Sequence, residues 1–478
     1  MISVVRELEP YSQGELRQFF GEDTSWSELE KRLDRLHMLR RRSSYSAEEL
    51  DESEFSEHEH DEKAYSLSFV GVYVWKNRVV YSLPKYARLA LGNERYETLE
   101  NVEKHQELLR QLSTIMKVLR RYNKSRIKES LNALSQPAKD DYLALLVHIV
   151  SDYAHNGLYR DDISEENLNG RGRIMWQKTI QSTRPYIQNN RPCYMTPVLR
   201  HTVEDRDNFF TRLHLHIVDK CRQVLESAGL TKLLSLPQIN EESLPEQDMG
   251  DTHYLTNRIH GELNAQFDSR RRYILQLLLK YLNSQSARQH NLSDELVFGN
   301  TSFQLVWEEV CREVLGHDDR KILEIKPPEW EMYTQTGWTL GQTSKKSLEP
   351  DIIIKRTDSY WLFDAKYYLP ITQNGTVFRL PGVGDITKQF LYHQALPTEL
   401  PIHNAFLMPT PDDVDSEGNN IALFARVSMP LFEKLKYIYT YRIQPDTLYE
   451  AYLHSDKRTR VQDDMHASIQ NTLRLEKE

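Results

Sequence analysis

Cysteine is scarce in this chain of 478 residues, which contains only Cys193, Cys221 and Cys311. Three widely separated cysteines provide neither the CxxC pairs of a zinc ribbon nor a paired disulfide framework. We therefore expect reduced cysteines and a cytoplasmic protein.

Long apolar runs are also missing. The most apolar stretches, Tyr142–Val150 and Tyr273–Leu282, are about ten residues each, roughly half of what a membrane-spanning helix needs. No charged and apolar signal pattern follows Met1. These two absences predict a water-soluble protein with no membrane association.

An excess of positive charge is absent as well, because 61 Lys and Arg stand against 70 Asp and Glu, a net charge of -9. A protein that coats nucleic acid neutralises many phosphates with clustered basic residues, so any DNA contact here must be local. The strongest local candidate is Lys117–Lys128, with six basic residues and no acid. A solvated helix face has the same pattern, and both interpretations stay open.

The length of the chain is enough for roughly two to four domains. Short helices are expected at residues 1–42, and Glu48–Glu62, with nine acids and neither Lys nor Arg, predicts a mobile linker. Residues 1–64 are therefore assigned to an N-terminal helical segment and acidic linker. We expect residues 65–294 to form a mixed domain for partner or DNA contact, and residues 295–478 a separate α/β domain.

The periodicity of apolar residues predicts a helix-rich N-terminal region with a small β element. Alternation between Phe69 and Leu83 predicts a β-hairpin, and Asn167–Pro185 is loop-like and then strand-like. Helical spacing predicts long helices at residues 93–134, 138–156, 203–229 and 257–284.

The last third of the chain predicts an α/β domain with a central mixed sheet flanked by helices, which makes the whole chain α+β. The order αβββαβ is obtained if Ile322–Lys326 or nearby residues supply the first strand. The other predicted elements are a helix at Glu295–Leu315, strands at Asp351–Lys355 and Tyr360–Tyr367, a helix at Asp385–Leu396, and strands at Asn404–Met408 and Ala422–Val427.

Two carboxylates and a lysine stand at the ends of predicted strands. Pro350 and Asp351 precede a β-branched run, and Asp364-Ala365-Lys366 ends the next strand. Residues two apart in a strand share a face, so Asp364 and Lys366 point the same way and a hairpin brings Asp351 beside them. A lone D-x-K is more often a surface or turn pair, but the flanking strands favour a site.

Such a group has the chemistry that phosphodiester hydrolysis needs. Asp351, Asp364 and the carbonyl oxygen of Ala365 are hard oxygen ligands for Mg²⁺, with Mn²⁺ as a substitute. The metal lowers the pKa of a bound water, and Lys366 supplies a fixed positive charge for the attacking water or the phosphate.

Two further positions are candidates for the same site. Glu308 lies at the edge of the apolar stripe of the helix 301–315, where it either reaches the metal or faces water, and Glu309 is its rival. Gln389 and Tyr392 share one face of the next helix, where they either line a nucleotide channel or pack on the sheet.

Taken together, these motifs carry a family resemblance. PDIII, LFDAKYY and DITKQFLY resemble the PD-(D/E)XK nuclease fold and are similar to the nuclease subunits of McrBC-like systems. FVGVYVW with SLPKY, and NGRGRIMWQKTI, extend the resemblance to the LlaJI-type restriction endonuclease family, from about residue 65 onward.

The resemblance implies an Mg²⁺-dependent endonuclease of an anti-phage restriction system acting on double-stranded DNA. It makes Asp351 and Asp364 metal ligands, Lys366 the catalytic lysine and Gln389 a residue beside the site. It also implies an AAA+ GTPase or ATPase partner of the McrB type, in agreement with the absence of a GxxxxGK[ST] phosphate loop, and an oligomer within that complex. An autonomous type II restriction endonuclease and a non-catalytic scaffold subunit are the alternatives.

Overall fold

The computed structural model describes residues 2–21, 24–41, 65–75, 78–88, 96–99, 106–132, 142–168, 171–205, 208–227, 230–233, 236, 249–291, 296–318, 329–334, 337–343, 349–373, 376–396, 400–410 and 419–476. The predicted acidic linker Glu48–Glu62 and the predicted strand Ile322–Lys326 lie outside these residues. The chain divides into two compact units, one of residues 1–126 with 294–478 and the other of residues 127–293.

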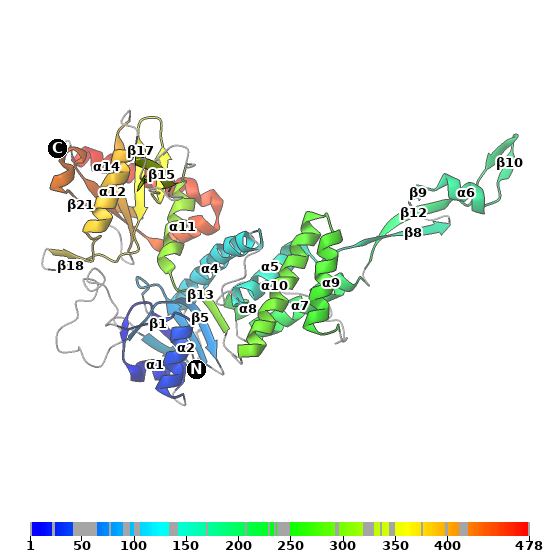
Figure 1. The fold of residues 1–478 in the computed structure, drawn as a ribbon, viewed down its shortest axis with the longest axis horizontal. Helices are drawn as coiled ribbons and strands as arrows, with labels where there is room; N and C mark the ends of the chain where they lie inside the picture. The colour runs from blue at the N-terminus through cyan, green and yellow to red at the C-terminus, as the bar shows by residue number, and fades with distance from the viewer. Residues whose placement is uncertain are drawn as a thin grey trace. The chain divides into compact units, whose positions relative to one another are not determined.

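The first unit contains a five-stranded N-terminal sheet in the order β13-β5-β6-β1-β7 (Figure 1). The predicted hairpin is confirmed as β5 and β6, and β1 pairs with β6 in parallel. Helix α1 begins at a capping box in which Ser12 and Glu15 exchange hydrogen bonds. The elements are β1 (Ile2–Arg6), α1 (Gln13–Phe20), α2 (Trp26–Arg35), β5 (Val70–Trp75), β6 (Arg78–Leu83), β7 (Tyr96–Leu99) and β13 (Leu296–Asn300), with the small sheet β2 (Pro10–Tyr11), β4 (Tyr65–Leu67) and β3 (Leu39–Arg41) beside them.

Two predicted helices begin too early, because their first residues are strands of this sheet. Residues 96–99 form β7 on the edge of β1, and residues 296–300 form β13 on the edge of β5. Pairing of β13 requires glycine at two facing positions, since a Cβ on Gly71 or Gly299 would lie 2.2 or 2.3 Å from a carbonyl oxygen of the other strand. Hydrogen bonding to a distant strand thus outweighs local helical spacing.

A second, mixed sheet has the order β16-β17-β20-β22-β21, in which β17, β20 and β22 are parallel and the two edge strands antiparallel. Leu362 packs with Tyr392 of α12, and the neighbouring Trp361 contacts His466 of α14, so helices cover both faces. The predicted α+β class and flanked mixed sheet are confirmed. The elements are α11 (Phe303–Leu315), β16 (Ile352–Lys355), β17 (Tyr360–Ala365), α12 (Val383–Ala395), β20 (Ile402–Pro409), β21 (Ile421–Val427), β22 (Ile438–Ile443), α13 (Pro445–Leu453) and α14 (Arg458–Leu475), with the hairpins β14 (Glu329–Thr334) and β15 (Gly337–Thr343), and β18 (Ile371–Gln373) and β19 (Thr376–Phe378).

The basic run Lys117–Lys128 lies on α4 (Gln106–Asn132). Arg121 pairs with Glu313, donates to the carbonyl oxygen of Leu453 at 3.4 Å and lies 4.5 Å from the centre of the Tyr452 ring. Arg120, the residue before it, is partly buried, and this burial lowers the pKa of its guanidinium. Arg121 therefore joins α4 to α11 and α13, which neither of the two interpretations of this run predicts.

The second unit is a helical bundle with a β extension. Figure 1 shows β8 and β12 leading away from the helices. Two segments differ from the prediction. Residues 203–204, expected in a helix, belong to strand β12. In Asn167–Pro185, expected to become strand-like after its glycines, Trp176–Ser182 forms helix α6, where Thr179 accepts a hydrogen bond from the Val198 N–H at 3.0 Å. The elements are α5 (Tyr142–Asn156), β8 (Asp162–Leu168), β9 (Arg173–Ile174), α6 (Trp176–Ser182), β10 (Tyr186–Gln188), β11 (Arg191–Cys193), β12 (Val198–Glu204), α7 (Phe209–Ser227), α8 (Leu230–Leu233), α9 (Thr252–Ala265) and α10 (Ser269–Asn291).

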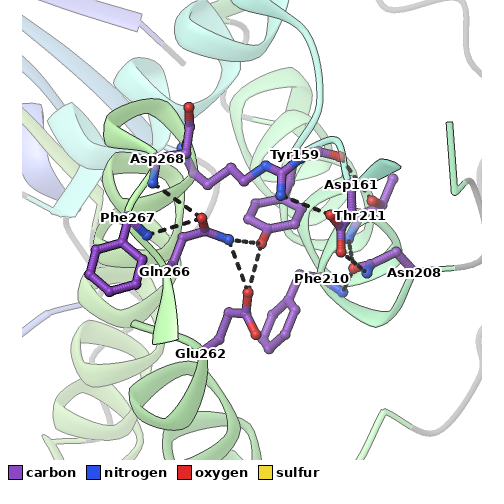
Figure 2. Close-up of polar contacts among 10 residues, drawn as sticks. Tyr159, Asp161, Asn208, Phe210, Thr211, Glu262, Gln266, Phe267 and Asp268 are labelled. Carbon is purple, nitrogen blue, oxygen red and sulfur yellow. Dashed lines mark hydrogen bonds and ion pairs between the residues drawn. The ribbon is translucent and has the colours of Figure 1, made fainter. Parts of the chain in front are cut away.

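A polar network holds the base of this extension to the bundle (Figure 2). The hydroxyl of Tyr159 donates to Glu262 of α9 at 3.1 Å. Asp161, the residue before β8, accepts hydrogen bonds from Asn208 at 3.2 Å and from Arg271 of α10 at 2.8 Å. The extension is thus anchored on three helices at the point where it leaves them.

In the described part of the chain, every helix is too short or too polar to cross a membrane.

Candidate functional site

The two predicted carboxylates meet on adjacent strands. Ile352 of β16 pairs with Phe363 of β17, so Asp351 lies opposite Asp364 one position further along. Asp351 accepts a hydrogen bond from the N–H of Ala365 at 3.1 Å, which fixes its carboxylate at the end of β17. Asp364 is buried, with 2% of its surface exposed. The hairpin geometry expected from the sequence therefore brings both aspartates together.

Lys366 completes the group. Its ammonium lies 3.1 Å from Oδ2 of Asp364 and donates to Oδ1 of Asp385 at 2.8 Å. Burial works to lower the pKa of Lys366, but the charges of Asp364 and Asp385 outweigh it and raise that pKa. Lys366 therefore stays protonated between two carboxylates. It has the fixed positive charge that the sequence predicted at this position.

Two residues that sequence reasoning missed also hold this geometry. Asp385, in the first turn of α12, accepts from Lys366 through Oδ1 and from the hydroxyl of Tyr368 through Oδ2 at 3.4 Å. Arg312 of α11 donates to the carbonyl oxygen of Asp351 at 2.9 Å. An acid opening a helix just after the strand motif was the available signal for Asp385. Nothing in the local sequence indicated Arg312.

The environment of Asp364 is unfavourable for its own charge. Burial, followed by the neighbouring Asp351, raises the pKa of Asp364 to about 7. Oδ2 of Asp364 is buried, and within the described residues it accepts no aligned hydrogen bond, although the Lys366 ammonium is close enough for an ion pair. The ion pair with Lys366 is thus the polar contact that this buried oxygen has within the described residues.

Glu308 and Glu309 of α11 face different surroundings. Burial and then the charge of Asp364 raise the pKa of Glu308, whereas Glu309 acts on Tyr452, whose pKa is raised first by burial and further by acids that include Glu309. The electrostatic coupling to Asp364 belongs to Glu308. Of the two rivals, Glu308 is the one that interacts with Asp364 through its charge.

Gln389 and Tyr392 pack under the sheet. The amide of Gln389, which is fully buried, donates to Asn404 at 2.7 Å and to the carbonyl oxygen of Leu362 at 3.4 Å. The Tyr392 hydroxyl donates to the carbonyl oxygen of Glu349 at 2.8 Å. Among the described residues neither side chain hydrogen-bonds to Asp351 or Asp364, although burial and then the charges of both aspartates raise the pKa of Tyr392. Tyr392 therefore packs on the sheet, which was one of the two interpretations of its sequence position. Gln389 hydrogen-bonds to residues of β17 and β20.

The donor set fits a small divalent cation that keeps much of its water. Among the described residues, no three His, Cys, Asp or Glu side chains converge closely enough to enclose a metal. Magnesium is commonly held by one or two carboxylates with waters and phosphate oxygens, so a complete protein cage is not required. A cation bound at Asp364 would stabilise its buried negative charge, which burial and the neighbouring Asp351 now disfavour, as the raised pKa of the carboxyl indicates. The carbonyl oxygen of Ala365 as a ligand stays a prediction.

Comparison with known proteins identifies relatives. A model of the family described as LlaJI restriction endonuclease matches residues 69–437. The type II restriction enzyme BsuMI component YdjA of Bacillus subtilis (strain 168) is 25% identical over 401 residues, which cover 81% of each chain.

Two solved assemblies also show some likeness. In a half-complex of Thermococcus gammatolerans McrB AAA+ hexamers with bound McrC, the matched chain is 13% identical, the match covers 97% of this chain and 99% of that one, and the TM-score is 0.37. A chain of the Thermococcus gammatolerans McrBC complex matches with 13% identity, coverage of 62% and 89%, and a TM-score of 0.19.

Proposed function

This chain belongs to the LlaJI restriction endonuclease family, and from that premise we propose that it is the Mg²⁺-dependent DNA-cleaving subunit of a restriction system. The observation that carries the proposal is the convergence of Asp351, Asp364 and Lys366 at the ends of β16 and β17. A metal-binding aspartate pair with an adjacent cation is suited to hydrolysis of a phosphodiester.

Each residue has a defined part in this proposal. Asp351 and Asp364 would hold the ion, and Glu308 would add a negative charge that acts on Asp364. Lys366 directs its positive charge at the attacking water or the scissile phosphate, while Asp385 fixes the orientation of its ammonium. When bound, Mg²⁺ supplies Lewis-acid activation of water and neutralises charge that develops on the phosphate.

Contact with DNA is assigned to residues outside the mixed sheet. Between residues 171 and 200 the extension carries six Lys and Arg and no acid, in a chain of net charge -9, and two of these cations, Lys178 and Arg200, pair with Glu166 of the neighbouring strand β8. Trp176 and Tyr186 are 57% and 69% exposed there. Positive charge is needed to approach the phosphate backbone of double-stranded DNA, and this segment concentrates it.

We further propose that cleavage depends on a separate AAA+ subunit that hydrolyses GTP or ATP. The chain has no phosphate loop of its own, and the Bacillus subtilis relative is called a component of its restriction enzyme. The predicted resemblance to nuclease subunits of McrBC-like systems favours the same division of labour. An autonomous type II enzyme and an inactive scaffold are the alternatives.

Dependence on the partner is tested by mixing purified chain, duplex DNA and Mg²⁺ with and without the NTPase that accompanies it. We expect the complete mixture with GTP or ATP to cut at least about ten times faster than the lone chain, as required if the NTPase controls cutting. Efficient site-specific cutting by the lone chain would establish the autonomous enzyme, and an inert complete mixture would favour the scaffold.

The neighbours Glu308 and Glu309 provide a matched pair of variants. Glu308→Gln removes the charge that acts on Asp364 and should slow cleavage by roughly 10- to 100-fold, with a higher Mg²⁺ requirement. Glu309→Gln, one position along the same helix, should leave both quantities within about two-fold. Initial rates across a Mg²⁺ titration measure the difference, and equal effects of the two variants would remove Glu308 from the site.

A further inference from the structure

A buried hydrogen bond joins the N-terminal sheet to the residue next to Lys366. Glu7, directly after β1, has 2% of its surface exposed, and its Oε2 accepts from the hydroxyl of Tyr367 at 2.9 Å. A carboxylate is costly to bury without such a donor.

The same phenol is held from a second segment of the N-terminal sheet. The N–H of Lys85, in the loop after β6, donates to the Tyr367 hydroxyl at 3.2 Å. The Lys85 ammonium lies 4.8 Å from the centre of the Tyr367 ring. Phe303, at the start of α11, packs against that ring with centres 5.5 Å apart. Tyr367 is thus fixed at its hydroxyl and at its ring.

Tyr367 lies two residues beyond the end of β17, where strand pairing no longer fixes the backbone. The strand ends at Ala365, and the Lys366 N–H donates to the carbonyl oxygen of Leu407 at 2.9 Å. The side chain of Lys366 points to Asp364 and Asp385, whereas that of the next residue, Tyr367, reaches the N-terminal sheet. Fixing Tyr367 therefore limits the backbone torsions that aim Lys366.

A similar contact holds Asp385, the hydrogen-bond partner of Lys366. Tyr368 donates to Oδ2 of Asp385, whose Oδ1 accepts from Lys366, and the Lys85 ammonium lies 5.7 Å from the centre of the Tyr368 ring. Tyr367 and Tyr368, the two residues after Lys366, are therefore both held in part by Lys85, in the loop after β6.

We propose that Glu7 and Tyr367 are positioning residues through which the N-terminal sheet aims Lys366 at the aspartate pair. The inference rests on the proposed nuclease function, and it gives the N-terminal sheet a direct part in the chemical step. Small displacements of a catalytic group cost about 10- to 100-fold in rate, so the effect should be measurable.

The test uses the full-length chain in the complete cleavage mixture. Tyr367→Phe keeps the ring and removes the hydroxyl, so kcat should fall about 10- to 100-fold while KM for DNA stays within about two-fold. Glu7→Ala should give the same result. Glu7→Gln keeps an acceptor oxygen for Tyr367 and should restore kcat to within about three-fold of the unmodified chain.

Tyr449→Phe is the matched control, because the Tyr449 hydroxyl contacts that of Tyr86 between the same two regions but, among the described residues, makes no hydrogen bond to Glu7, Tyr367 or Lys366. It should lower thermal stability without lowering kcat. Unchanged kcat in Tyr367→Phe and Glu7→Ala, or an equal loss in Tyr449→Phe, overturns the proposal. If Lys366→Ala itself cuts at the unmodified rate, the nuclease assignment fails and the positioning role fails with it.

Discussion

Replacing Lys366 by Ala should lower the rate of DNA cleavage by at least about a thousand-fold, because it removes the one cation that the described structure places against both Asp364 and Asp385. Asp364→Asn should cause a loss of the same order, since a neutral amide cannot hold Mg²⁺ as a carboxylate does. Single-turnover cleavage of labelled duplex DNA by the complete mixture measures both. Undiminished cutting by either variant would contradict the assignment of the site.

A control must show that these variants still fold. The raised pKa of Asp364 predicts how Asp364→Asn changes the stability of the chain. In the folded chain the pKa of Asp364 is raised from 3.8 to about 7. The contribution of protonated Asp364 to the free energy of unfolding is therefore fully present below about pH 4 and is lost as the pH rises through 7. Asp364→Asn has no such loss. In metal-free buffer at pH 8 the variant should therefore be as stable as the unmodified chain or more so, by up to the order of 2–4 kcal/mol.

Chemical denaturation at pH 5 and pH 8 in the presence of a chelator tests this expectation. The stability difference between Asp364→Asn and the unmodified chain should grow from the lower to the higher pH. A variant that is strongly destabilised at both values would indicate that Asp364 serves the fold, and the loss of cleavage would then need another explanation.

Removing divalent metal should abolish cleavage completely, the second large effect that the site predicts. Every candidate ligand, Asp351, Asp364, Glu308 and the carbonyl oxygen of Ala365, offers oxygen, which selects Mg²⁺ or Mn²⁺ rather than a thiolate-binding metal. Adding Mg²⁺ or Mn²⁺ back after chelation should restore the rate. Ca²⁺ should bind without turnover, because its larger and looser coordination does not impose the octahedral geometry of Mg²⁺.

Two measurements separate binding from turnover. Mg²⁺ and Ca²⁺ should both raise the melting temperature of the unmodified chain at pH 8, while Asp364→Asn should respond to neither. Cleavage after exhaustive dialysis against chelator, or zinc retained in a one-to-one ratio with the chain, would count against an oxygen-ligated magnesium site.

The local sequence predicted the centre of the site because its parts are close along the chain. Asp351 and Asp364 flank one antiparallel hairpin, and Lys366 follows two residues later on the same strand face, so strand periodicity alone brought them together. The same reasoning predicted strands β16, β17, β20 and β21, whose apolar runs are short and bounded by polar residues.

Residues joined by long-range contacts could not be predicted in this way. Local helical spacing extended two helices over residues 96–99 and 296–300, where pairing with β1 and β5 makes strands instead. Similar local reasoning predicted that Asn167–Pro185 becomes strand-like after its glycines, although Trp176–Ser182 forms the helix α6, which contacts β12. In each segment a partner far away in the sequence supplied the deciding interaction.

The sequence by itself thus determined which groups gather at the candidate site, two carboxylates and a lysine at strand ends, because residue type and a two-residue period are local properties. Only the tertiary structure decided which glutamate acts on them, that Asp385 fixes the lysine, and that Glu7 reaches Tyr367 across 360 positions. Those choices depend on how separate elements pack, since burial and distance set the strength of each charge interaction and neither is encoded in local periodicity.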